Sequence, residues 1–136
     1  MREHGSFTLE LDKHILILRA FGAWNYETAH RCIEEVKILI NNVENTWLCL
    51  IDFSLWELGT PEVWEKFNEL YDWRNNSNNN IEVIISNCDL QRYMMKKSKA
   101  DHISIKTMFF QHTNEAMRCL DQLRTGEKTF TLGHLN

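Results

Sequence analysis

Hydrophobic and polar positions alternate along the first segment of the chain. Over residues 6–11 the apolar side chains fall on one side of an extended backbone and the polar ones on the other, which predicts a half-buried strand. A polar break at residues 12–13 separates this segment from the apolar residues 14–21, and the pair predicts a β-hairpin. Few polar residues occur in the second segment, which is typical of a strand covered on both faces.

Helical periodicity takes over after the hairpin. Apolar residues recur at helical spacing over residues 26–40, and Asn25, just before them, is a favoured N-cap. A second helix is predicted to open at Thr60-Pro61-Glu62, where a hydroxyl, a proline and an acid stand in the order that helix starts favour. Asp89 and Thr113 occupy the corresponding positions before two further helical patterns.

Three more strands are predicted between these helices, at residues 46–53, 81–86 and 105–110. The resulting order, β-β-α-β-α-β-α-β-α, predicts an α/β fold that starts with a β-hairpin. Helical crossovers imply parallel neighbours, so the economical architecture is a mixed, mostly parallel five-stranded sheet with helices packed on it. The whole chain, residues 1–136, is predicted to form one domain, with residues 125–136 as a loosely held tail.

Composition narrows the class of protein. The net charge of −4 disfavours nucleic-acid binding, which relies on clustered Lys and Arg. No apolar run is long enough to span a membrane and the N-terminus lacks the core of a signal peptide, so a cytoplasmic protein is expected. The four cysteines lack metal-ligand spacing. They are expected to be buried thiols, and neither a metal nor a cofactor is predicted.

The predicted binding region follows from the topology. In an open α/β sheet, ligands and partners meet the crevice beyond the carboxyl ends of the parallel strands. The residues of the three loops expected there are the candidate partner- or ligand-binding residues: Trp24, Asn25, Asp52, Ser54, Trp56, Thr60 and Asn87.

Each candidate also has a structural interpretation, which the sequence leaves open. Asp52 could hold the turn after its strand, and the two tryptophans could simply cover the core. Thr60 could be a plain helix cap, although its hydroxyl, and more weakly that of Ser54, is also a candidate for phosphorylation.

No pattern in the sequence indicates catalysis. Six histidines occur, but none has the spaced nucleophile or acid that an enzyme site requires, so no catalytic residue is predicted. Basic residues cluster over 92–99 and acidic ones over 57–72. These opposite charges would permit self-association, and a homodimer is one expectation.

The hairpin, the strand Leu48-Cys49-Leu50-Ile51-Asp52-Phe53-Ser54 and the helix start at Thr60-Pro61-Glu62 together resemble a STAS domain. This is the fold of bacterial anti-anti-sigma factors of the SpoIIAA type. Residues 108–116 resemble the last strand and helix entry of SpoIIAA-like proteins, and the turn at residues 22–25 is similar to that of small uncharacterised proteobacterial members.

The resemblance implies a non-enzymatic regulatory or protein-interaction domain. It also implies a phosphorylatable Ser or Thr at the helix after the third strand, usually within Asp-Ser-Ser-Gly. Here the segment reads Gly59-Thr60-Pro61-Glu62, so proline stands near the phosphoserine position and Thr60 is the nearest hydroxyl. The resemblance also implies a fold suited to apolar or lipid-like ligands between helices and sheet, so a small-molecule or lipid-binding module is the alternative function.

Overall fold

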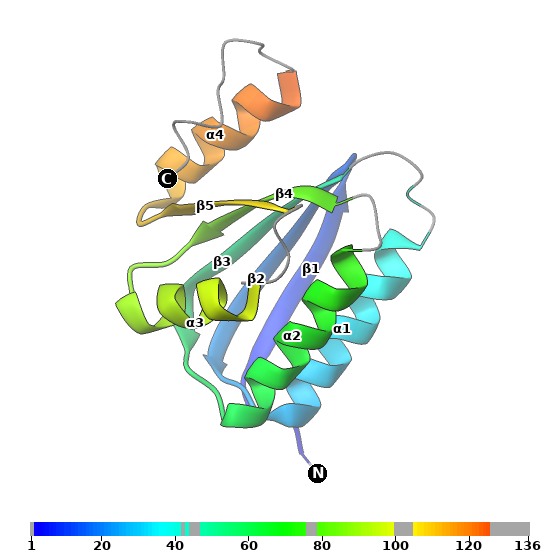
Figure 1. Cartoon of the computed structure of the whole chain (residues 1–136), viewed down its shortest axis with the longest axis vertical. Coiled ribbons are helices and arrows are strands. Elements are labelled where there is room, and N and C mark those ends of the chain that lie inside the picture. Colours follow the sequence, from blue (N-terminus) through cyan, green and yellow to red (C-terminus); the bar gives the residue numbers. More distant parts are fainter. Residues whose placement is uncertain (1, 42, 44–46, 76–78, 100–104, 126–136) are drawn as a thin grey trace.

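A hairpin followed by alternating helices and strands makes up the chain (Figure 1). The structure is a computed structural model that describes residues 2–41, 43, 47–75, 79–99 and 105–125. Its elements are β1 (Ser6–Asp12), β2 (Ile15–Ala23), α1 (Tyr26–Ile40), β3 (Trp47–Glu57), α2 (Pro61–Asn75), β4 (Asn79–Ile85), α3 (Asp89–Lys99), β5 (Lys106–Phe110) and α4 (Thr113–Thr125). The predicted tail lies almost wholly outside the described residues.

The five strands form one sheet in the order β1-β2-β3-β4-β5. The β1–β2 pair is antiparallel, and the β2–β3, β3–β4 and β4–β5 pairs are parallel. The prediction of a mixed, mostly parallel sheet that begins with a hairpin is therefore confirmed. Because neighbours in the sheet are also neighbours in the chain, β1 and β5 are left at the two edges.

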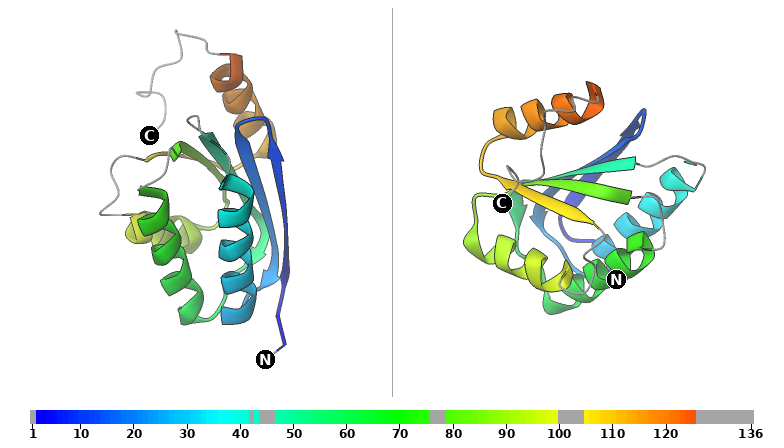
Figure 2. Two further views of the ribbon diagram at one scale, coloured as in Figure 1. Left: turned by 90° about the vertical axis from the view of Figure 1, so that its right-hand side faces the viewer. Right: turned by 45° about the horizontal axis from the view of Figure 1, so that its top comes forward.

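Helices cover both faces of the sheet, as Figure 2 shows: α1, α2 and α3 lie on one side and α4 on the other. The alternation along β3 reflects this, since Cys49 and Ile51 join the core under α1 and α2 while Leu50 packs towards α4. Burial on both sides explains why β2, β3 and β4 read as nearly continuous apolar runs.

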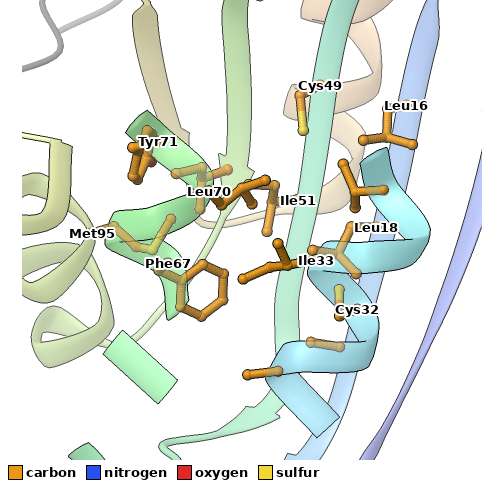
Figure 3. Packing of buried hydrophobic residues seen from close by; sticks show 14 of the residues in the cluster. Leu16, Leu18, Cys32, Ile33, Cys49, Ile51, Phe67, Leu70, Tyr71 and Met95 are labelled. Carbon is orange, nitrogen blue, oxygen red and sulfur yellow. The ribbon is translucent and has the colours of Figure 1, made fainter. Parts of the chain in front are cut away.

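The larger core lies between the sheet and the helices α1 and α2. In Figure 3, Cys32 and Ile33 of α1 and Phe67 and Leu70 of α2 approach side chains of the strands such as Ile51. These helical residues fall on the apolar faces that the sequence pattern predicts. Burial of those faces fixes how both helices lie on the sheet, and with that where each helix begins.

The third strand is longer than predicted. The sequence indicates a strand over residues 46–53 followed by an aromatic loop, but β3 continues to Glu57. The pairing with β2 shifts register between Arg19 and Phe21 and then resumes, with Leu55 opposite Phe21. Continued pairing with β2 over residues 55–57 satisfies backbone hydrogen bonds there, so the predicted loop is extended strand.

Two further findings concern the described residues. No helix among them is long and apolar enough to cross a membrane. No group of three or more potential metal ligands gathers in the same part of the chain.

All four cysteines are free thiols, and Cys32, Cys49 and Cys119 are buried. Burial raises the pKa of the Cys49 thiol to about 12, so it is protonated and unreactive at neutral pH.

Candidate functional site

The carboxyl ends of β2, β3 and β4 meet at one edge of the sheet, which we call the rim. Two hydrogen bonds connect its segments. The Thr60 N–H before α2 donates to the Trp24 carbonyl after β2 at 3.2 Å. The Gln91 amide of α3 donates to the Trp56 carbonyl near the end of β3 at 2.8 Å. The loops that the sequence places together are therefore in direct contact.

Trp24 lies inside the rim rather than on it. Only 2% of its surface is exposed, and its indole N–H donates to the Ser6 carbonyl of β1 at 2.9 Å. Its ring contacts Trp56, with centroids 5.7 Å apart, and lies parallel to the ring of Phe67. A tryptophan with a satisfied N–H and packed ring faces is a core residue.

Asn25 caps α1 and is also buried. Its side-chain oxygen accepts from the Thr28 N–H at 3.2 Å, which satisfies one of the free donors at the helix start. Its amide nitrogen donates to the Arg2 carbonyl at 2.8 Å. The predicted N-cap is therefore confirmed, and the same side chain holds the N-terminal residues.

Residues 2–5 form an N-terminal strap across the start of α1. The His4 N–H donates to Asn25 Oδ1, and the Thr28 hydroxyl donates to the His4 carbonyl at 2.7 Å. Glu3 pairs with Arg31 at 2.6 Å, which lowers the pKa of the Glu3 carboxyl. The strap therefore covers the N-terminus of α1.

Trp56 occupies the centre of an aromatic cluster between α2 and the sheet. Its ring stacks on Phe53 at 4.4 Å between centroids and meets Trp64 edge-on at 5.6 Å. Within the described part of the chain its buried indole N–H has no hydrogen-bond partner. The rings of this cluster fill the space between helix and sheet, so Trp56, like Trp24, supports the rim from below.

Asp52 organises the end of β3. Its Oδ1 accepts both the Ser54 N–H at 2.9 Å and the Ser54 hydroxyl at 2.7 Å. Asp52 and Ser54 lie inside β3, where the pairing with β2 shifts register, so the carboxylate holds this irregularity of the strand and not the turn after it. Ser54 itself is exposed, and its hydroxyl is held by this contact.

Thr60 stands exposed immediately before α2. Its hydroxyl bonds the Glu62 carboxylate, which lowers the pKa of that carboxyl. The Thr60 carbonyl accepts from the Val63 N–H at 3.0 Å, and Pro61 is the first helical residue. The helix start is therefore where the sequence predicts it, with Thr60 bonded to an acid of the first turn.

The loop between β4 and α3 adds the last part of the rim. The Ser86 hydroxyl bonds Gln91 at 2.7 Å, and Arg92 donates to the Ser86 carbonyl at 2.7 Å. These contacts fix the loop and leave the Asn87 side chain exposed. We define the exposed rim as the accessible residues on β3 and the two loops: Ser54, Leu55, Glu57, Thr60 and Asn87.

The seven predicted site residues thus divide into two groups. Trp24, Asn25 and Trp56 are buried, so a direct binding role for their side chains stays a prediction. Asp52 is half-buried, whereas Ser54, Thr60 and Asn87 are exposed on the same rim. Sequence reasoning missed Leu55, whose side chain is 67% exposed. Simple alternation from Phe53 would bury Leu55, and only the register shift in the pairing of β3 with β2 turns it outward.

A buried polar cluster away from the rim was also missed. Glu82 of β4 accepts from the Tyr71 hydroxyl, from Arg74 and from the Thr107 hydroxyl, at 2.6, 2.6 and 2.7 Å. Desolvation raises the pKa of Tyr71 well above its usual range, so the phenol stays a donor. The cluster ties the end of α2 to β4 and β5.

Comparison with known proteins gives the fold a name. No protein-family model matches the chain, and no curated protein matches it in sequence. A solved structure of an uncharacterised DUF3478-family protein with a SpoIIAA-like fold, from Shewanella loihica PV-4, has a TM-score of 0.65 and 14% identity. The match covers 88% of this chain and 96% of that one.

Two anti-sigma factor antagonists are also similar in structure. Unphosphorylated SpoIIAA has a TM-score of 0.59 and 14% identity, over 88% of this chain and 98% of its own. The protein from Mycobacterium paratuberculosis has a TM-score of 0.59 and 9% identity, over 87% and 95%. The described chain therefore has the SpoIIAA-like α/β fold.

Proposed function

We propose that this chain is a cytoplasmic, non-enzymatic regulatory domain that binds a protein partner through the exposed rim. The observation that carries the proposal is Leu55. This large apolar side chain is 67% exposed among the polar residues Ser54, Glu57 and Thr60. An apolar anchor with a polar surround is the usual anatomy of a protein-binding site.

The position of Leu55 adds support. It lies in β3 close to the carboxyl end of the strand, the end at which α/β sheets bind their ligands and partners. The residues beneath it are fixed, because Trp56 is packed in the aromatic cluster and its carbonyl is bonded to Gln91. A rigid support lowers the entropy lost on binding. Two solved proteins with this fold are described as anti-sigma factor antagonists, which agrees with a regulatory role.

Two features favour a protein partner over the other classes. The space between α2 and the sheet is filled by packed aromatic rings, which disfavours an apolar ligand there. Among the described residues, the histidines His4, His14, His30 and His112 are exposed, and none bonds a serine, cysteine or carboxylate side chain. That pattern supports a non-enzymatic role.

Regulation by phosphorylation at Thr60 is the less favoured part of the family expectation. The position is exposed and lies at a helix start, where the dipole favours a phosphate. Its hydroxyl, however, already bonds Glu62, and Glu57 is close in sequence. A dianion there would meet negative charge, so we propose that the rim binds its partner with Thr60 unmodified.

Photo-crosslinking in the native cell tests the proposal. The photoreactive residue p-benzoylphenylalanine is placed at Leu55 and, as the control, at Arg118, which is exposed on α4 across the sheet. We expect one discrete heterologous protein to be trapped from Leu55 and not from Arg118. Equal trapping from both positions, or none from Leu55, would overturn the proposal.

A further inference from the structure

We propose that β1 is the dimerisation edge of this protein and that a second copy of the chain pairs with it antiparallel across a two-fold axis. The two edges of the sheet differ. β5 is five residues long and begins with the exposed Lys106, whereas β1 is seven residues long. No other strand in the described part of the chain pairs with the outer side of β1.

β1 also lacks most of the devices that normally protect an edge: its two charged residues, Glu10 and Asp12, are each paired within the chain, with Arg19 and Arg124. Proteins blunt exposed edges with proline, bulges or inward-pointing charges. Residues 6–12 contain no proline, and their pairing with β2 runs without a register shift. The side that faces α1 carries Phe7, Leu9 and Leu11, all half-buried and packed on the core. Such a strand is a template for adding another.

An apolar groove lies beside this edge. It measures about 270 Å³ and is lined by Phe7, Leu9, Arg31, Glu35, Ile38 and Leu39. Ile38 of α1 is 72% exposed, more than Leu55 at 67% or Tyr93 at 60%. In the left view of Figure 2, β1 is the outermost strand with α1 beside it. Free backbone groups and exposed apolar surface therefore occur at one place.

Charge identifies a second copy as the occupant. Arg31 lies over the Phe7 ring, 4.3 Å from its centroid, and Glu35 follows one helical turn later on the same groove. A two-fold axis at Thr8 sets Phe7 opposite the second copy's Leu9. Within each copy Arg31 already pairs with Glu3 and with Glu35, at 2.6 and 2.5 Å. The same axis brings each Arg31 opposite the other copy's Glu35, so these charges join into one alternating cluster across the axis. The edge is thus complementary to itself in shape, in backbone pairing and in charge.

This interface is independent of the exposed rim. It uses the lateral edge of the sheet and α1, whereas the rim lies at the carboxyl ends of β3 and β4. A dimer would therefore present two rims. The short strand pair and single helix contact are smaller than a standard interface, so we expect a reversible dimer.

Light scattering after size exclusion tests the proposal, over a concentration series up to about 1 mM, where small interfaces assemble. We expect the mass to rise from monomer to dimer. Ile38→Glu should weaken association roughly tenfold to a hundredfold, the effect of losing one buried aliphatic contact. Leu55→Glu is the matched control, equally exposed but on the rim, and should leave association unchanged. A monomer at every concentration, or equal effects of the two variants, overturns the proposal.

Charge exchange tests the symmetry. Arg31→Glu and Glu35→Arg should each be monomeric, and an equimolar mixture of the two should form a heterodimer. The pairing register is tested in a Cys88→Ser background with oxidised glutathione. Two copies of Thr8→Cys should form an intermolecular disulfide, because side chains directly opposite each other come within disulfide range. Lys106→Cys, on the other edge of the sheet, should form none. No heterodimer, or no Thr8→Cys link, contradicts this pairing.

Discussion

The guanidinium of Arg74 and the carboxylate of Glu82 meet at 2.6 Å with 1% and 0% of their side chains exposed. The two residues come from different elements, the end of α2 and the middle of β4. Each charge loses its hydration on burial, and its attraction to the other charge offsets that loss. The two side chains are therefore tolerated in the core only as a complete pair.

Removing one member should therefore cost more than removing both. We expect Arg74→Leu to lower the free energy of unfolding by about 3–5 kcal/mol, since it leaves a buried carboxylate without its cation. The double variant Arg74→Leu/Glu82→Leu should be clearly more stable than that single variant. Urea denaturation measures both, and a double variant no more stable than Arg74→Leu would contradict the account.

The strap makes a prediction about glycine. Gly5 and Gly22 both have positive φ, at 74° and 71°. A Cβ at Gly5 would lie 2.7 Å from Trp24 Cδ1 and 2.8 Å from the Phe21 carbonyl, whereas at Gly22 the nearest atom is 3.3 Å away. Gly22→Ala should cost about 1–2 kcal/mol from backbone strain alone. Gly5→Ala should cost more, as measured by urea midpoints; equal costs would argue against close packing at Trp24.

Asn25 has two roles that substitution can separate. Asn25→Asp keeps the oxygen that caps α1 but loses the amide that donates to Arg2. Asn25→Ala loses both and should lower stability by about 1 kcal/mol from the lost cap alone. We expect the aspartate variant to melt near the wild-type temperature while its N-terminal strap exchanges amide hydrogens faster. Unchanged exchange at His4 in both variants would show that Asn25 does not hold the strap.

Alkaline pH should destabilise the protein through its buried thiols. The pKa of Cys49 is raised to about 12 by burial, from 9.0 for an ordinary thiol. Because the unfolded thiol loses its proton first, stability is complete below pH 9 and falls as the pH rises towards 12. Cys49 should account for about 1.4 kcal/mol of the loss per pH unit in this window. Unfolding midpoints at several pH values should fall less steeply in Cys49→Val, and an identical slope would be the contrary result.

The sequence predicts the fold well because its signals are local. The alternation in β1, the cap at Asn25 and the proline after Thr60 each depend on neighbouring residues, and each lies where expected. The length of β3 was mispredicted because its last residues owe their conformation to pairing with β2 beyond a register shift. Such pairing is non-local and leaves no periodic trace.

The gathering of the loops at one rim was predicted from the sequence, whereas the binding role of the rim residues stays a prediction. The gathering of the loops follows from parallel strands alone. Which side chains are exposed depends on the strap and on the aromatic cluster, both assembled from distant segments. The pairing of Arg74 with Glu82 had a sequence signal: a cation on the apolar stripe of α2 and an acid inside an apolar strand, eight residues apart. Two opposite charges at positions expected to be buried indicate an ion pair.

The most direct test of the account is the affinity of the protein trapped at Leu55 for two matched variants, measured by calorimetry. Leu55→Asp removes the exposed apolar anchor of the rim, and Ile38→Asp changes an equally exposed residue on α1. We predict that Leu55→Asp weakens partner binding by about 2 kcal/mol or more, the loss typical of a central anchor. Ile38→Asp should leave the partner affinity of each chain at the wild-type value. Wild-type affinity for Leu55→Asp would contradict the claim that this rim is the binding surface.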